Sequence, residues 1–241
     1  MRLLSKLTEN LITLLFPNIC LNCRKITPLK YFCKDCRNSV SSIHLKTCPD
    51  CGLPQKLCDC KWNIYYFDEI ISCFEADEAT KRSFYSFKFG GNLVGAEFFS
   101  KEMSKRIKNN SLYLDLDVIT SVPSHRSTLR ERGYDQVKVL AKDISKIIKV
   151  KYQPLLRQPS PSPKQHETEG IAERFTNVLG KYEVLKNADV RDKTILLVDD
   201  IKTTGATLSQ CARELKLAGA SCVIAISALT VYPKDKEENN F

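Results

Sequence analysis

One segment of this 241-residue chain combines carboxylates, hydroxyls and a glycine in a spacing that suits a phosphorylated sugar. The four apolar residues 195–198 are typical of a buried parallel strand, which we expect Asp199 and Asp200 to end. Apolar residues at helical spacing from Leu208 onward predict a helix after a short loop. Unpaired backbone N–H groups and the helix dipole attract an anion to a loop in this position. The loop residues are Thr203, Thr204, Gly205, Ala206 and Thr207.

This loop and the carboxylates before it predict two different contacts. Gly205 lets the backbone approach a phosphate closely, and the threonine hydroxyls add hydrogen-bond donors. Asp199 and Asp200 repel phosphate, but they suit a neutral diol, whose two adjacent hydroxyls donate to carboxylates. Phosphate on one side and a diol on the other describe a ribose 5-phosphate. An ordinary buried strand with an acidic turn would explain the apolar residues, but not the Thr-Thr-Gly-Ala-Thr run.

The segment 195–207 resembles the phosphoribosyl-pyrophosphate (PRPP) signature of type I phosphoribosyltransferases. In that signature, apolar residues precede Asp-Asp, two variable residues and Thr-Thr-Gly-Ala-Thr, and this chain matches it throughout. The resemblance implies that Asp199, Asp200 and residues 203–207 bind PRPP. It also implies that Mg²⁺ accompanies PRPP, held by the pyrophosphate oxygens.

Eight of the eleven cysteines lie between residues 20 and 60, in four close pairs. The pairs are Cys20/Cys23, Cys33/Cys36, Cys48/Cys51 and Cys58/Cys60. A Cys-x-x-Cys knuckle directs two thiolates at one tetrahedral zinc ion, and two knuckles complete a four-cysteine site. We expect one or two structural zinc ions, because every ligand is cysteine and about forty residues do not fold on a core of their own.

Two zinc arrangements fit the same spacing: sequential sites, or interleaved sites in which the first pair joins the third. The pair Cys58-Asp59-Cys60 is one residue shorter than a full knuckle, which makes the second site the less regular one. A disulfide framework is the alternative to zinc. The missing signal peptide and the cytosolic substrate argue against it, because cytosolic thiols stay reduced.

Bulk properties restrict the class of protein without choosing the ligand. The net charge of +9 suits anionic partners, whether a phosphorylated sugar or a nucleic acid. No stretch approaches the roughly 18 consecutive apolar residues of a membrane span. Lys6 and Glu9 interrupt the N-terminal leucines and no cleavage site follows, so we expect an amphipathic helix over 1–17 and not a signal peptide. We therefore expect a cytoplasmic protein that begins at Met1.

From about residue 66 the pattern alternates between strand and helix. We expect strands at 67–74, 117–123 and 155–156, helices at 78–87, 93–107 and 137–148, and a turn at 88–91. Three prolines alternate with polar residues in the segment 157–177, which predicts a long loop. This composition alone is typical of a linker. Sheet elements on both sides favour a lid over the ligand site instead.

A strongly basic loop follows the strand expected at 117–123. Ligands of an open α/β sheet bind at the carboxyl ends of its strands, so this loop suits a second anion. Arginine offers paired donors to phosphate oxygens. The candidate ligands of a pyrophosphate group are Ser124, His125, Arg126 and Arg130. Alternatively, these arginines are solvated or pair with Glu131 and Asp135.

Taken together, these segments resemble the ComF family over residues 10–232. The segments that carry the resemblance are 14–17, the four cysteine pairs, 87–91, 122–125, 129–136, Gln165, Arg174, Asn177 and the PRPP signature. The chain departs from the family pattern at three points. Arg126 replaces the usual proline, Asp135 replaces the usual asparagine, and the last cysteine pair is shortened.

The resemblance implies an α/β fold, a type I phosphoribosyltransferase-like open and mostly parallel sheet with a small N-terminal cysteine-rich zinc-ribbon module. It also implies that the lid contributes Lys164, Gln165 and Arg174 to the site. We expect four parts: the N-terminal helix at 1–17, the zinc-ribbon module at 18–62, the phosphoribosyltransferase-like domain at 63–232 and a polar tail at 233–241.

The ComF family is associated with natural transformation, so the resemblance implies DNA uptake, with PRPP, single-stranded DNA and the uptake machinery as partners. The basic and aromatic segment 81–89 suits the stacking of single-stranded bases, although Phe84, Phe87 and Phe89 equally suit a core. The alternative is an active phosphoribosyltransferase with an unknown acceptor. We expect no glutamine-hydrolysing half, because such a half needs an N-terminal cysteine and this chain opens with Met1.

Overall fold

The computed structural model describes residues 17–43, 46–58, 60, 65–90, 93–124, 129–130, 133–159 and 180–232. The helix expected at 1–17 lies outside these residues except for Pro17. The tail expected at 233–241 lies wholly outside them. Within the described part of the chain, no helix is long and apolar enough to cross a membrane.

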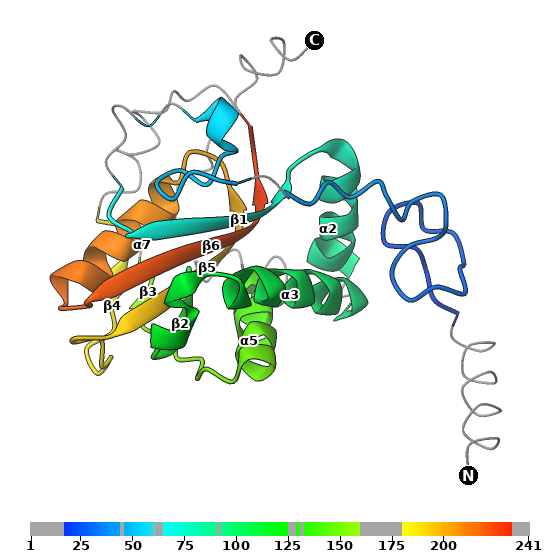
Figure 1. Cartoon of the computed structure of the whole chain (residues 1–241). Coiled ribbons are helices and arrows are strands. Elements are labelled where there is room, and N and C mark those ends of the chain that lie inside the picture. The colour runs from blue at the N-terminus through cyan, green and yellow to red at the C-terminus, as the bar shows by residue number, and fades with distance from the viewer. Residues whose placement is uncertain are drawn as a thin grey trace.

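A four-stranded parallel sheet forms the centre of the molecule (Figure 1). Its strands lie in the order β1 (Glu69–Glu75), β6 (Cys222–Thr230), β5 (Thr194–Lys202) and β2 (Val118–Ser121). Val118 lies opposite Ile195, which lies opposite Val223 on the other side. The central strands are nearly continuous apolar runs, as expected for strands that helices cover on both faces. A separate antiparallel pair contains β3 (Leu156–Arg157) and β4 (Glu183–Val184).

Helices cover both faces of this sheet. The helices in the described part of the chain are α2 (Glu78–Gly90), α3 (Leu93–Lys108), α5 (Gln136–Ile148) and α7 (Ala206–Leu217), with short 3-10 turns at η1 (Gln55–Leu57) and η2 (Ser111–Asp115). Leu196 and Val198 of β5 pack in the core shared with α2, α3 and α5. Ile195 and Leu197 point the other way and pack with α7. The expected α/β class with an open parallel sheet is confirmed.

Two local expectations are wrong. Asp199 and Asp200 do not end the strand, because β5 stays paired with β6 as far as Lys202, which lies opposite Thr230. Nor do residues 88–90 form a turn, because α2 continues through Gly90. The buried Phe87 ring packs at 5.8 Å from Phe84, so core contacts support the helix almost to its end.

The second half of the cysteine-rich segment is fastened to the edge strand of the sheet. The Ile70 N–H of β1 donates to the Pro49 carbonyl at 2.8 Å. Gly52 has a φ of +71°, and a Cβ at this position would lie 2.3 Å from the Ser72 hydroxyl oxygen, so only glycine fits. This segment therefore covers an edge that would otherwise expose unpaired backbone groups.

Candidate functional site

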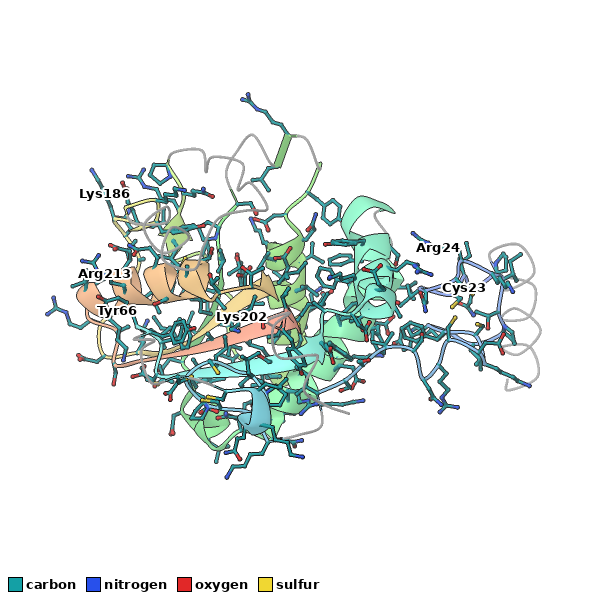
Figure 2. The ribbon with its side chains drawn as sticks, turned by 90° about the horizontal axis from the view of Figure 1, so that it is seen from above. Cys23, Arg24, Tyr66, Lys186, Lys202 and Arg213 are labelled. Carbon is teal, nitrogen blue, oxygen red and sulfur yellow. The ribbon has the colours of Figure 1, made fainter. Side chains whose placement is uncertain are left out.

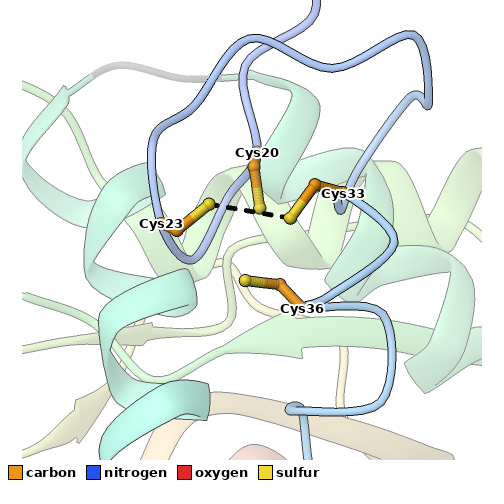
Figure 3. A group of neighbouring side chains, drawn as sticks. All are labelled: Cys20, Cys23, Cys33 and Cys36. Carbon is orange, nitrogen blue, oxygen red and sulfur yellow. Dashed lines mark hydrogen bonds between the residues drawn. The ribbon is translucent and has the colours of Figure 1, made fainter.

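The first two cysteine pairs meet in one group. The side-chain sulfur atoms of Cys20, Cys23, Cys33 and Cys36 all lie within 4.8 Å of one another (Figure 3). The sulfur atoms of Cys23 and Cys33 are 3.7 Å apart. In a tetrahedral site with zinc–sulfur bonds of about 2.3 Å, the sulfur atoms are about 3.8 Å apart. The geometry therefore fits one zinc ion with four thiolate ligands.

The last two cysteine pairs form a second group, with Cys48, Cys51, Cys58 and Cys60 again within 4.8 Å of one another. The sulfur of Cys60 lies 3.7 Å from that of Cys48 and 3.3 Å from that of Cys58. The sites are therefore sequential and not interleaved, and the shortened last pair still reaches its site. All eleven cysteines lie in the described part of the chain, and none of them forms a disulfide.

The pKa values of the thiols differ within the first group and are shifted in the second. Burial raises the pKa of Cys20, but backbone N–H groups, led by that of Cys33, lower it to about 6. Burial and the neighbouring thiols raise the pKa of Cys36 to about 12. In the second group, burial raises the pKa of Cys51 to about 11. A zinc ion removes this inequality, because it binds thiolates and displaces their protons.

The candidate phosphate loop joins the end of β5 to the start of α7. Gly205 is the N-cap of α7 and has a φ of +82°, a conformation that glycine adopts without strain. The Thr204 hydroxyl oxygen accepts from the Ala206 N–H at 3.4 Å, whereas Thr203 is exposed. The loop thus presents the first backbone N–H groups of a twelve-residue helix, as the sequence predicted.

The two carboxylates of the signature lie near the C-terminal end of strand β5, shortly before this loop. Asp199 is buried and its Oδ1 accepts from the Asp200 N–H at 2.8 Å, while Asp200 Oδ1 accepts from the Ile201 N–H at 2.7 Å. These bonds fix both side chains at the carboxyl edge of the sheet. The predicted phosphate loop and the predicted diol acceptors are therefore adjacent.

One further carboxyl adjoins the signature, and a pair of hydroxyls lies at the end of the neighbouring strand β2. Burial raises the pKa of Asp135, and the negative charge of Asp200 raises it further, so these two carboxyls are neighbours. Asp135 is also the N-cap of α5, where it accepts from the Lys138 N–H at 3.0 Å. The Tyr152 hydroxyl lies 3.1 Å from that of Ser121, at the end of β2.

Tyr182 and Tyr65 approach the loop from outside the signature. Burial raises the pKa of Tyr182, and the charges of Cys211 and Asp199 add to this effect, while a hydrogen bond with Thr207 opposes it. The Tyr65 hydroxyl donates to the Thr204 carbonyl at 3.1 Å. Neither tyrosine was predicted from the sequence, because each lies outside the signature along the chain and belongs to no motif.

The predicted pyrophosphate loop is described only in part. Ser124 is half-buried just beyond β2 and Arg130 is exposed. His125 and Arg126 lie outside the described residues. So do the lid residues Lys164, Gln165 and Arg174. Their assignments remain predictions.

A basic cavity of about 440 Å³ lies where the first cysteine pair faces α2. It is lined by Arg24, Glu78, Lys81, Arg82, Tyr85 and Ser86. Tyr85 is exposed, whereas Phe84 and Phe87 of the same helix are fully buried. These two phenylalanines therefore belong to the core, whereas Tyr85 lies on the solvent-facing side of α2. Arg24 was not predicted, because nothing in the sequence links it to residues 78–86.

Comparison with known proteins separates the chain into two matched regions. A double zinc ribbon domain matches residues 11–64, and a phosphoribosyl transferase domain matches residues 135–240. The first match contains both cysteine groups, and the second contains Asp199, Asp200 and the phosphate loop.

Curated relatives extend over most of the chain. The competence protein ComFC of Bacillus subtilis is 26% identical over 212 residues, which cover 83% of this chain and 84% of the relative. The ComFC of Streptococcus pneumoniae is 26% identical over 200 residues, covering 81% of this chain and 86% of the relative.

Among solved structures, the glutamine PRPP amidotransferase of B. subtilis is 18% identical, with a TM-score of 0.40, over 60% of this chain and 30% of that one. The adenine phosphoribosyltransferase of Thermoanaerobacter pseudethanolicus is 16% identical, with a TM-score of 0.38, over 59% of this chain and 83% of that one. A double zinc ribbon domain followed by a phosphoribosyl transferase domain, with ComFC relatives over most of the chain, confirms the resemblance to the ComF family.

Proposed function

We propose that this protein binds PRPP with Mg²⁺ at the carboxyl edge of its sheet and handles single-stranded DNA during DNA uptake. The observation that carries the first part is the loop 203–207 at the N-terminus of α7, which follows Asp199 and Asp200 after two further strand residues. A phosphate needs the donors of such a loop, and a ribose diol needs acceptors beside it.

Each part of the site has a separate role in this proposal. Backbone N–H groups and hydroxyls of residues 203–207 bind the 5-phosphate. Asp199 and Asp200 accept hydrogen bonds from the ribose hydroxyls. Ser124, His125, Arg126 and Arg130 bind the pyrophosphate group, whose oxygens hold Mg²⁺. The lid residues Lys164, Gln165 and Arg174 contact the bound ligand.

Calorimetric titration with PRPP and Mg²⁺ tests this proposal. Asp200→Asn keeps the shape of the side chain but removes its charge, and a hydrogen bond to a charged group contributes about 1.5–3 kcal/mol. We expect PRPP to bind about 10- to 100-fold more weakly to this variant. Asp143→Asn is the matched control, because Asp143 pairs with Lys146 on the outer face of α5. Wild-type affinity in Asp200→Asn refutes the assignment of the diol acceptor.

Two observations support the second part of the proposal. The relatives that match most of the chain are named competence proteins. The basic cavity combines three cationic side chains with the exposed ring of Tyr85. Single strands bind where cations follow the phosphates and an aromatic ring stacks on a base. We therefore assign single-stranded DNA to the cavity between Arg24 and α2.

Anisotropy titrations of a labelled oligonucleotide over a salt series test the DNA site. The logarithm of affinity changes with the logarithm of salt by about −0.7 per phosphate contact for single strands. Replacing Lys81 and Arg82 with glutamine should therefore reduce the slope by about 1.4. A variant with Lys105 and Arg191 replaced has the same net charge and should keep the wild-type slope. Equal slopes in the two variants remove the cavity from the proposal.

A further inference from the structure

The second cysteine group is connected to the phosphate loop through Tyr65. Cys48, Cys51 and Leu53 form a small buried cluster, and Tyr65 and Tyr232 pack against it. Tyr65 extends from this cluster to the loop, where its hydroxyl donates to the Thr204 carbonyl at 3.1 Å. One side chain thus touches both the four-cysteine group and the loop.

Tyr65 holds the loop by shape as well as by its hydrogen bond. Its Cε1 lies 3.0 Å from the position that a Cβ would have at Gly205. Its ring stacks on Phe67, with the centroids 4.8 Å apart and the planes at 16°. Burial raises the pKa of Tyr65, and the neighbouring cysteine charges raise it further, so the hydroxyl keeps its proton and remains a donor. The loop therefore rests on a ring that is itself fixed.

The residue after Tyr65 ties the same segment to the helix behind the loop. The Tyr66 N–H donates to the Ser209 hydroxyl at 3.1 Å. The Arg213 guanidinium lies over the Tyr66 ring, 5.8 Å from its centroid (Figure 2). Two consecutive residues that follow Cys60 by five and six positions therefore contact the loop and α7.

Lys202 approaches the same glycine of the loop as Tyr65. Its side chain is buried with 4% of the residue exposed, and its Cε lies 3.7 Å from the Cβ position at Gly205. Burial lowers the pKa of Lys202, whereas the charges of Cys51 and Cys60 raise it. A buried ammonium group requires a nearby counter-charge. Four thiolates around one Zn²⁺ would carry a net negative charge and would supply this counter-charge.

Among the described residues, the first cysteine group packs against α3 and not against the phosphate loop. Its cluster packs on Phe98 of α3, with the Phe32 and Phe98 rings 5.0 Å apart. Lys30 forms an ion pair with Glu97 of the same helix at 2.7 Å. In Figure 2, Cys23 lies on the module beyond α2, well away from Lys202 in the middle of the domain. The two zinc sites therefore differ in what they support.

We propose that Tyr65 is a positioning residue through which zinc at Cys48, Cys51, Cys58 and Cys60 sets the shape of the phosphate loop. Zinc holds the segment that carries Tyr65, and Tyr65 holds Thr204 and Gly205 so that the loop N–H groups converge on one phosphate. The inference rests on the proposed binding of PRPP. It predicts that the two zinc sites, although chemically alike, are unequal in function.

The first test compares one cysteine in each group. Cys60→Ser and Cys36→Ser each remove one half-buried ligand, and each should lower the zinc content measured by elemental analysis. Far-UV circular dichroism first checks that both variants fold. We then expect Cys60→Ser to weaken the affinity for PRPP at least about tenfold and Cys36→Ser to change this affinity less than about twofold. Equal PRPP affinities in the two zinc-depleted variants would overturn the inference.

The second test keeps both zinc sites intact. Tyr65→Phe removes only the hydroxyl, and a net hydrogen bond contributes about 0.5–1.5 kcal/mol, so PRPP should bind about 2- to 10-fold more weakly at unchanged zinc content. Tyr31→Phe is the matched control in the first module, where the Tyr31 hydroxyl accepts from Lys101 at 3.2 Å. Unchanged affinity in Tyr65→Phe contradicts the positioning role, including when Cys60→Ser fails to fold.

Hydrogen exchange of the loop amides separates this inference from the proposed function. The amides of residues 203–207 should exchange faster in Cys60→Ser and Tyr65→Phe than in Cys36→Ser and Tyr31→Phe, with no ligand present. If the wild-type protein binds no PRPP but this difference appears, the proposed function fails and the coupling stands. If PRPP binds and the exchange rates are equal, the coupling fails and the proposed function stands.

Discussion

Replacing Gly205 with alanine tests how tightly the phosphate loop is packed. Its φ of +82° lies in the left-handed region, where a side chain costs about 1–2 kcal/mol. The new Cβ would also lie 3.0 Å from Cε1 of Tyr65. The stacking on Phe67 and the hydrogen bond to Thr204 prevent the ring from moving away. Overpacking against such a fixed group costs about 1–3 kcal/mol.

Gly180→Ala provides the matched control for this prediction. Gly180 has a φ of +69°, but no atom lies within 4 Å of its Cβ position, so only the backbone cost applies. We expect Gly205→Ala to lower the free energy of unfolding by about 2–5 kcal/mol and Gly180→Ala by about 1–2 kcal/mol. Urea unfolding followed by circular dichroism measures both values.

A double-mutant cycle identifies the source of the difference. In a Tyr65→Ala background, the ring that crowds position 205 is gone, so Gly205→Ala should cost no more than Gly180→Ala. Contacting residues typically show interaction energies of about 0.5–3 kcal/mol in such cycles. If the two glycine variants destabilise the wild-type protein equally, the reasoning that Tyr65 packs on the loop is refuted.

Two further predictions concern zinc and the core. Purified, reduced protein should carry about two zinc ions per chain, because its eight N-terminal thiols form two groups of four, and elemental analysis that finds no zinc in folded protein contradicts this. Phe99→Ala should lower the free energy of unfolding by about 3–5 kcal/mol, because the ring is fully buried against Phe74, Phe84 and Phe98. Tyr85→Ala is the control in urea unfolding, because Tyr85 lies exposed on the surface of α2. A similar decrease in the free energy of unfolding in both variants contradicts the packing argument.

The parts of the site that the sequence predicted are those that local spacing determines. A Cys-x-x-Cys pair forms its knuckle within four residues, and a strand followed by a small-residue loop and a helix forms its anion site within about fifteen residues. Whether the sites are sequential or interleaved is not local. It depends on the path of the backbone between the pairs and on contacts with the rest of the fold. One such contact is the hydrogen bond from the Ile70 N–H to the Pro49 carbonyl, which fastens the second group to β1.

Asp135 shows why the surroundings of the site were harder to predict. In the sequence it is a departure from the family pattern and a potential partner for arginine. In the fold it caps α5, and the sheet order brings the start of α5 to the edge where Asp200 lies. A residue can be identified as a helix cap from its neighbours in sequence, but its contact with another element depends on the order of the strands.

The variable positions of the PRPP signature illustrate the same division between motif and fold. The resemblance assigns no ligand role to Lys202, and a lysine after two aspartates would ordinarily be expected at the surface. Instead β5 continues through Lys202, so the alternation of the strand turns this side chain inward toward the second cysteine group. The fixed residues of the signature suit a ligand that many phosphoribosyltransferases share. Lys202, one of its two variable residues, instead lies toward the zinc ribbon of this chain, so the motif and the ribbon contribute separately to the surroundings of one loop.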